Sequence, residues 1–247
     1  MNTETAIIIL AAGKGKRMNS DIPKVLHKLD NTTLIDRVIQ TSRSLGCSKI
    51  IVVVGHQKEK LKEALKKHSD IEYAIQEEQK GTAHAVKMCF NNLENFSGNV
   101  IILSGDVPLI DLLTLEKLLD IKDKINAKAS VLTADIENPD GYGRIIRDNN
   151  GLLKKIVEHK DCNNNELLIN EINAGIYIVD NNCLFDYIPK IGNQNAQSEY
   201  YLPDLINLII KDKQLASVYK TNNIVEISGV NSKEQLNELE KYLKNNG

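Results

Sequence analysis

The stretch AIIILAAGKGKRM, residues 6–18, decides the fold. Its first seven residues are all apolar, and a short apolar run bounded by glycine is typical of a buried strand. Two glycines follow, Gly13 and Gly15, and glycine lets a backbone approach a ligand closely. The lysines and the arginine of the same stretch place positive charge beside exposed N–H groups, an arrangement that suits phosphate. The stretch therefore indicates an α/β protein that handles a nucleotide.

Two better-known phosphate loops are excluded by the spacing. A dinucleotide-binding loop reads G-x-G-x-x-G, and Met18 stands where its third glycine belongs. A P-loop reads G-x-x-x-x-G-K-[ST], and the sequence contains no such run. The glycines alone are also compatible with a plain strand-to-helix turn. Arg17 and Lys24 favour an anion site, because a structural turn needs no such cations, although a solvated charged face remains the alternative.

The bulk composition limits the class of protein. A chain of 247 residues can bury roughly 70–75% of its unfolded surface, so it needs no disulfide or structural metal. Its net charge of −2 argues against a general nucleic-acid or membrane binder. The four cysteines form no C-x-x-C pair and are expected to be reduced thiols in a cytoplasmic protein. No targeting segment or membrane-spanning run is recognised, and neither zinc-binding histidine spacing nor a G-x-S-x-G elbow occurs.

Strand and helix patterns alternate along the chain. In the first half, β-branched runs predict strands and helical spacing of apolar residues predicts helices between them: strands 50–54, 71–75 and 100–103, and helices 57–68 and 82–90. The second half is richer in strands: strands 129–136, 143–147, 152–157 and 176–179, then helices 199–211 and 232–244. The pattern predicts one Rossmann-like α/β domain, with a mixed, mostly parallel sheet and helices on both faces. We expect residues 1–110 to form a nucleotide-binding half, 111–230 a sugar-binding half and 231–247 a C-terminal helix.

Three candidate site residues directly follow strands. Gly13, Gly105 and Asp106 come after predicted strand ends, and ligands of open α/β sheets bind beyond the carboxyl ends of strands. These residues should therefore meet in one crevice. A carboxylate beside phosphates is suited to Mg²⁺, although Asp106 taken alone fits a helix N-cap or a turn aspartate better.

Further segments carry a resemblance to a known family. They occur in this order: LAAGKGKRM (10–18), PKVL (23–26), QEEQKGTAHA (76–85), GDVPL (105–109), GYGR (141–144), IVEHK (156–160), EINAG (171–175), NAQSEYY (195–201) and GVN (229–231). Together they resemble the sugar-nucleotide pyrophosphorylases over essentially the whole chain. They are most similar to the N-acetylglucosamine-1-phosphate uridyltransferase half of bifunctional bacterial enzymes.

The resemblance implies a Mg²⁺-dependent reaction of UTP with N-acetyl-α-D-glucosamine 1-phosphate, giving UDP-N-acetylglucosamine and pyrophosphate for cell-wall and lipopolysaccharide precursors. It also implies site residues in four roles. These are Arg17 and Lys24 for catalysis; Leu10, Ala11, Ala12, Gly13, Gln76, Gly81, Thr82, Ser104 and Gly105 for the nucleotide; Gly143, Glu158 and Asn173 for the sugar; and Asp106 and Asn231 for the metal. Among the nucleotide contacts, Gln76, Gly81 and Thr82 would read the uracil edge, and a glutamine amide can pair with a base as donor and acceptor together.

Several of these residues also have ordinary structural interpretations. Gln76 could be a polar residue at a strand end, and the three sugar-side residues could be a turn glycine, a surface acid and a strand-end amide. Tyr200 and Tyr201 either line the sugar pocket or are core aromatics.

The sequence departs from the family pattern at three positions and in length. Lys16 replaces a small hydroxyl residue, Ser104 a tyrosine and Pro203 a threonine, so substrate preference and turnover are open. No hexapeptide repeats of an acetyltransferase β-helix are present, so we expect no acetyltransferase activity and a monomer or weak homo-oligomer. Two alternative functions stay open: transfer to another base or sugar phosphate, or a catalytically silent regulatory module of the same fold.

Overall fold

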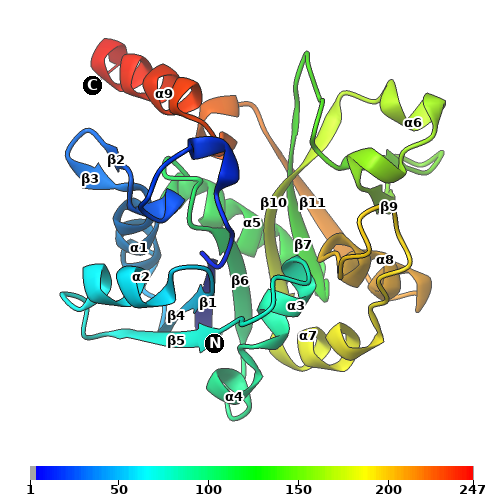
Figure 1. The fold of residues 1–247 in the computed structure, drawn as a ribbon. Coiled ribbons are helices and arrows are strands. Elements are labelled where there is room, and N and C mark those ends of the chain that lie inside the picture. Colours follow the sequence, from blue (N-terminus) through cyan, green and yellow to red (C-terminus); the bar gives the residue numbers. More distant parts are fainter. Residues whose placement is uncertain (1–3, 247) are drawn as a thin grey trace.

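The computed structural model describes residues 4–246, without the side chains of Lys16 and Asn246 (Figure 1). The strands are β1 (Thr5–Leu10), β2 (Lys28–Leu29), β3 (Thr32–Thr33), β4 (Lys49–Val54), β5 (Ile71–Ile75), β6 (Asn99–Ser104), β7 (Ala129–Asp135), β8 (Arg144–Arg147), β9 (Leu153–Val157), β10 (Glu171–Asp180) and β11 (Ala216–Thr221). The α-helices are α1 (Leu34–Ser44), α2 (Lys58–Leu65), α3 (Thr82–Lys87), α4 (Phe90–Leu93), α5 (Leu112–Lys124), α6 (Asn164–Leu167), α7 (Asn181–Tyr187), α8 (Pro203–Lys211) and α9 (Lys233–Asn246). Short 3₁₀ helices are η1 (Lys16–Met18), η2 (Lys24–Leu26), η3 (His159–Asp161), η4 (Ile188–Lys190) and η5 (Ile224–Ile227).

One mixed sheet of nine strands organises the molecule. Its main path runs β11-β7-β10-β6-β1-β4-β5, and β8 and β9 are attached through β10. The pairs from β6 through β1 and β4 to β5 are parallel, whereas β10 is antiparallel to both β6 and β7. The predicted fold class is confirmed: a Rossmann-like, mostly parallel sheet.

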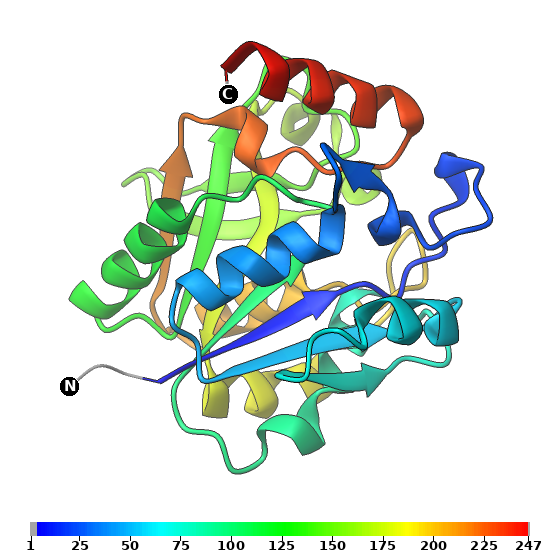
Figure 2. The same cartoon turned by 90° about the vertical axis from the view of Figure 1, so that its left-hand side faces the viewer.

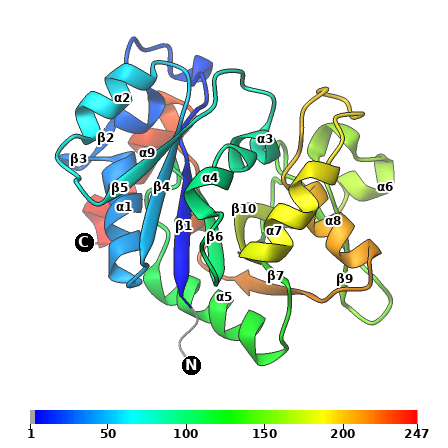
Figure 3. The same cartoon turned by 90° about the horizontal axis from the view of Figure 1, so that it is seen from below.

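Helices cover both faces of this sheet, as predicted (Figures 2 and 3). Side chains alternate along a strand, so Ala6 and Ile8 of β1 face one side and Ile7 and Ile9 the other. The first side packs against α3, α4, α7 and α8, and the second against α1, α2 and α5. Two apolar cores thus hold the carboxyl ends of β1 and β6 in fixed positions.

A third, smaller core brings the end of the chain back to its beginning. Met18 and Leu29 pack with Val230 and with Leu239 of α9. Figures 1 and 2 show α9 beside the β2–β3 hairpin, above the edge where β1 ends. This packing carries the segment before α9 to the glycine-rich loop.

Some elements differ from the sequence-based prediction. The sequence reading named no element at β11 or α5, and it began the last strand at residue 176, whereas β10 begins at Glu171. The helix predicted from residue 199 begins at Pro203, because Tyr200 instead pairs through its backbone with Lys80 and Ala83. Within residues 4–246, none of the helices is both long and apolar enough to cross a bilayer.

Candidate active site

The glycine-rich loop follows β1 and turns back across the sheet edge. The N–H group of Ala11 donates to the carbonyl of Val53, which holds the start of the loop to β4. Gly15 has a φ of +57°, and a Cβ atom there would lie 2.9 Å from the Cβ atom of Lys24. Glycine is therefore required at this position for the loop to lie against Lys24.

Lys24, Asp106 and Asn231 meet at the edge of this loop. The ammonium of Lys24 forms an ion pair with Asp106 Oδ2, and it donates to Asn231 Oδ1 over 2.8 Å. The Lys24 and Asp106 side chains are each 17% exposed, so their charges interact in a partly desolvated environment. The N–H group of Val230 donates to the backbone carbonyl of Asp106 over 2.8 Å, which ties the two segments together. The structure therefore brings the two predicted metal ligands to one point.

This donor set fits a magnesium ion. A carboxylate oxygen and an amide oxygen both contact the same Lys24 nitrogen, so both could contact one cation. Both are hard oxygen ligands, which Mg²⁺ prefers, and Mg²⁺ binds through one or two protein groups while keeping water and phosphate oxygens. A Cβ atom on Gly229 would lie 3.4 Å from Asn231 Nδ2, so a small residue keeps this corner open.

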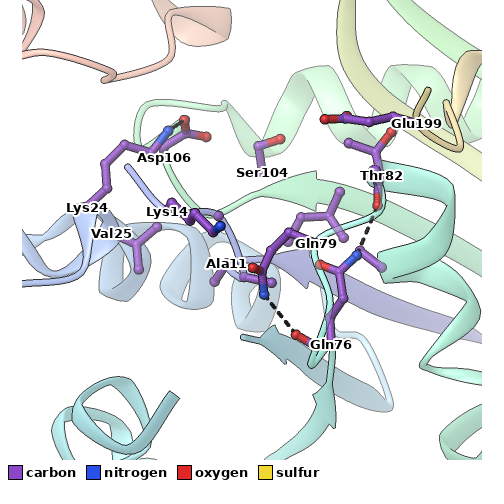
Figure 4. A pocket seen from close by; sticks show the side chains of 15 residues that line it. Ala11, Lys14, Lys24, Val25, Gln76, Gln79, Thr82, Ser104, Asp106 and Glu199 are labelled. Carbon is purple, nitrogen blue, oxygen red and sulfur yellow. Dashed lines mark hydrogen bonds and ion pairs between the residues drawn. The ribbon is translucent and has the colours of Figure 1, made fainter. Parts of the chain in front are cut away.

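A cavity of about 510 Å³ lies beyond the ends of β1 and β6 (Figure 4). Most predicted nucleotide contacts line it, together with residues that the sequence analysis did not assign to the site. The lining is Leu10, Ala11, Ala12, Gly13, Lys14, Lys24, Val25, Gln76, Gln79, Gly81, Thr82, Ala85, Ser104, Asp106 and Glu199. Lys14 could have been included, since it belongs to the same cationic loop. Gln79 and Glu199 carry no comparable signal.

Gln76 enters this cavity from the end of β5, and its amide is already engaged. Its Nε2 atom donates to the carbonyl of Gly81 over 3.0 Å and lies 3.0 Å from Nδ1 of His84. One donor of this amide is therefore used within the protein, and its Oε1 acceptor has no partner among these contacts. That Gln76 pairs with a base as donor and acceptor together stays a prediction.

Gly81 is fixed in place by the chain opposite. Its φ is +110°, and a Cβ atom would lie 2.5 Å from the backbone oxygen of Tyr200. The hydroxyl of Thr82 accepts a hydrogen bond from the N–H group of Leu202 over 2.9 Å. The loop that carries the nucleotide-side residues is thus bound to the loop before α8.

A second cavity, of about 190 Å³, adjoins the first. It shares Leu10, Thr82 and Ser104 with the larger cavity, and it contains all three predicted sugar-side residues. Its lining is Leu10, Thr82, Ser104, Gly141, Tyr142, Gly143, Glu158, Asn173, Ala174, Gly175, Tyr177, Leu202 and Pro203. Ser104 and Pro203, two of the departures from the family pattern, thus lie on its wall, whereas the side chain of Lys16 lies outside the described part of the chain.

A distortion of β10 shapes this second cavity. The pairing of β10 with β7 shifts between Asn173 and Tyr177, and Gly175 has a φ of +74° at the bend. The Asn173 amide donates to the Tyr177 hydroxyl over 2.6 Å and accepts from the Gly175 N–H group over 3.1 Å. Its side chain is therefore held in one orientation.

Glu158 also lines this cavity, in an acidic neighbourhood. Burial raises the pKa of its carboxyl, and the negative charges of Asp161 and Asp204 add to the shift. A Cβ atom on Gly143 would lie 3.6 Å from Glu158 Oε1, so Gly143 leaves this carboxylate accessible. The wall thus offers a hydrogen-bond acceptor to a polyhydroxylated ligand.

Five predicted residues lie outside both linings: Arg17, Gly105, Tyr200, Tyr201 and Asn231. Arg17 is exposed in η1, and Asn231 contacts Lys24, which lines the larger cavity. The N–H group of Gly105 donates to the Leu10 carbonyl over 2.9 Å, so Gly105 holds β6 against β1. Tyr200 and Tyr201 line neighbouring hollows rather than the sugar-side cavity, and burial raises the pKa of Tyr201 to about 12.

Comparison with known proteins identifies the family of this chain. The model of the family described as nucleotidyl transferase matches residues 6–226. The chain belongs to this family.

Individual relatives are similar over most of the chain. The Bifunctional protein GlmU of Bacillus cytotoxicus is 47% identical over 238 residues, which are 96% of this chain and 51% of that protein. The protein of the same name from Staphylococcus saprophyticus is 46% identical over 237 residues, 96% of this chain and 52% of that protein. The chain spans about half the length of these relatives.

Solved structures confirm the fold. A UDP-glucose pyrophosphorylase complexed with UDP-glucose has a TM-score of 0.78 at 18% identity, and the match covers 99% of this chain and 100% of that chain. A putative glucose-1-phosphate thymidylyltransferase from Bacillus anthracis has a TM-score of 0.73 at 17% identity, covering 96% and 94% of the two chains. At this identity, the likeness concerns the fold alone.

Proposed function

We propose that this nucleotidyl transferase joins UTP and N-acetyl-α-D-glucosamine 1-phosphate, forming UDP-N-acetylglucosamine and pyrophosphate. One observation carries the proposal: two cavities meet at Leu10, Thr82 and Ser104, and Lys24 and Asp106 lie at the edge of the larger one. Such a shape suits two substrates that react at their junction. The similarity to GlmU proteins favours this base and this sugar.

The reaction needs positioning and charge neutralisation more than covalent chemistry. An oxygen of the sugar phosphate attacks the α-phosphorus of UTP, and pyrophosphate leaves on the opposite side. Lys14 and Lys24, which line the nucleotide-side cavity, and Arg17 of the same cationic loop would neutralise the triphosphate and the leaving pyrophosphate. Holding both substrates in line removes much of the entropic cost of bringing them together.

Asp106 and Asn231 would hold Mg²⁺ in this enzyme. The ion, when bound, supplies positive charge that stabilises phosphate oxygens. Lys24 contacts the same two oxygens, so lysine and metal compete for them. Because UTP and sugar phosphates are metabolites of the cytoplasm, we place the reaction there, in the supply of cell-wall precursors.

The sugar side would recognise its substrate through fixed polar groups. The oriented Asn173 amide and the Glu158 carboxylate can pair with sugar hydroxyls and the acetamido group. A site built on such bonds rejects a ligand that leaves its buried polar groups unpaired.

A pyrophosphate-release assay over all nucleoside triphosphates and several sugar 1-phosphates tests the proposal. We expect the fastest turnover with UTP and N-acetylglucosamine 1-phosphate. A preference for another pair would identify a different sugar-phosphate nucleotidyltransferase. Absence of turnover with every pair would favour the silent regulatory module.

A further inference from the structure

The orientation of the Gln76 amide is fixed by two neighbours of different chemistry. Gln76 is 3% exposed at the end of β5, and its Nε2 atom lies 3.0 Å from the Gly81 carbonyl oxygen. A carbonyl oxygen can only accept hydrogen bonds, so the amide nitrogen must face it. Nε2 also lies 3.0 Å from Nδ1 of His84, in helix α3.

This arrangement determines the protonation of His84. Since the Gly81 carbonyl fixes Nε2 as the atom facing His84, the imidazole Nδ1 must accept the second hydrogen of Nε2. The ring is then neutral, with its hydrogen on its own Nε2. A protonated ring would instead set an N–H group against an N–H group.

We propose that His84 is a positioning residue that makes the nucleotide-side cavity select uracil. This inference rests on the proposed function. With the Gln76 nitrogen held by Gly81 and His84, only the Oε1 acceptor is presented to a base. Uracil offers an N3–H donor to that oxygen, whereas cytosine offers an N3 lone pair, which an acceptor repels. His84 acts through Gln76 and lies outside the lining of the cavity itself.

The surroundings of His84 favour its neutral form. Burial lowers its pKa, and the positive charges of Lys80 and Lys87 lower the pKa further, against the opposing effect of Glu78. The Tyr200 ring lies 6.3 Å away, centroid to centroid. The segment from η4 that faces the same hollow contributes uncharged residues: Ile188, Pro189, Ile191, Gly192 and Asn193.

Uracil binding and protonation of His84 are therefore opposed. Because a bound uracil requires the neutral ring, UTP should lower the pKa of His84 further. The KM for UTP should rise as the pH falls through the pKa of His84 in the free enzyme. At neutral pH and above, His84 should contribute no pH dependence.

Nitrogen NMR of the histidine rings tests the tautomer without any turnover. At pH 7.5 we expect the His84 signal, assigned by its loss in His84→Asn, to show a hydrogen on Nε2 and none on Nδ1. Adding UTP without metal should shift its titration to lower pH. A hydrogen on Nδ1 at pH 7.5 would overturn the proposal.

A competition experiment tests the selectivity. Equal UTP and CTP are offered with N-acetylglucosamine 1-phosphate, and the ratio of UDP-sugar to CDP-sugar is measured, which does not depend on the fraction of folded enzyme. His84→Leu replaces Nδ1 by a methyl group and should lower this ratio at least about tenfold. His84→Asn places an oxygen acceptor at the same position and should keep a ratio close to that of the wild type.

The outcomes separate the two proposals. An unchanged ratio in His84→Leu, or equal losses in both variants, would refute the role of His84 while leaving the uridyltransferase activity intact. If the wild type forms no nucleotide sugar at all, the proposed function fails, and the tautomer measurement still decides the state of His84.

Discussion

Replacing Asp106 with asparagine should remove most of the activity while leaving the fold intact. The substitution keeps the shape of the side chain and removes its charge. Asp106 is 17% exposed and contacts the Lys24 ammonium, so its charge acts where water screens it weakly. Electrostatic groups in such sites contribute about 3–4 kcal/mol to transition-state stabilisation, and we therefore expect kcat/KM to fall by about 10²–10³-fold.

The cost to folding should be much smaller. Asn231 Oδ1 still accepts from Lys24 over 2.8 Å, so the ammonium keeps one partner. The pair lies between an exposed and a fully buried ion pair, so the loss in unfolding free energy should be about 1–2 kcal/mol. For a chain of this length, that lowers Tm by only a few degrees.

Pyrophosphate release with UTP and N-acetylglucosamine 1-phosphate, measured over a range of Mg²⁺ concentrations, gives the activity. Thermal melts of the same samples give the stability. Asp120→Asn is the matched control, because Asp120 is exposed on α5, and it should retain wild-type values. Near wild-type turnover in Asp106→Asn, or in excess chelator, would refute the assignment of Asp106 as a metal ligand.

Further outcomes are expected. Lys24→Ala should lose turnover, and it should bind Mn²⁺ at least as tightly as the wild type, because lysine and metal compete for the same two oxygens. Arg17→Ala should lose activity without a change in Tm. An Arg17→Ala enzyme with wild-type activity would remove Arg17 from the mechanism. Gly81→Ala should destabilise the fold by about 2–4 kcal/mol in denaturant titrations, since its Cβ would lie 2.5 Å from a backbone oxygen, whereas Gly192→Ala, with open space around it, should not. Glu158→Gln should raise Tm at pH 7, because the pKa of Glu158 is raised in the folded state and its ionised carboxylate therefore disfavours the fold. The gain in Tm should vanish as the pH falls through that folded-state pKa. A lower Tm of Glu158→Gln at pH 7 would contradict this prediction. N-acetylglucosamine 1-phosphate should exceed glucose 1-phosphate in kcat/KM at least about tenfold, or about 1.4 kcal/mol, and equal values would point to another sugar.

Much of the fold could be predicted because its strands are short apolar runs bounded by glycine or polar residues. The convergence of Gly13 and Asp106 followed from one rule, that ligands bind beyond the carboxyl ends of strands. Strand β11 was missed because its sequence, ASVYKT, alternates weakly and its buried residues, Ser217 and Thr221, are polar. Its place beside β7 is decided by packing between distant segments, which local periodicity does not contain.

In the candidate site too, some contacts could be predicted from the sequence and others depend on the packing of distant segments. Asn231 lies 207 residues from Lys24, and only the resemblance to a family suggested that the two would meet. The structure supplies the physical reason: Val230 and Leu239 pack on Met18 and so bring the segment before α9 to the loop.

The Gln76 amide marks the limit of reasoning from sequence about a binding residue. Residue type gives the hydrogen-bonding capacity of a side chain, which for glutamine is two donors and an acceptor. A ligand can bind only to the donors and acceptors of that side chain that are not already hydrogen-bonded to other protein groups. Here the Gly81 carbonyl and the His84 ring take both donors, and those partners come from a loop and a helix whose position depends on the backbone of Tyr200. In our proposal, the base that the cavity accepts is therefore set by contacts between protein groups, and His84 acts on it through Gln76 without touching the substrate.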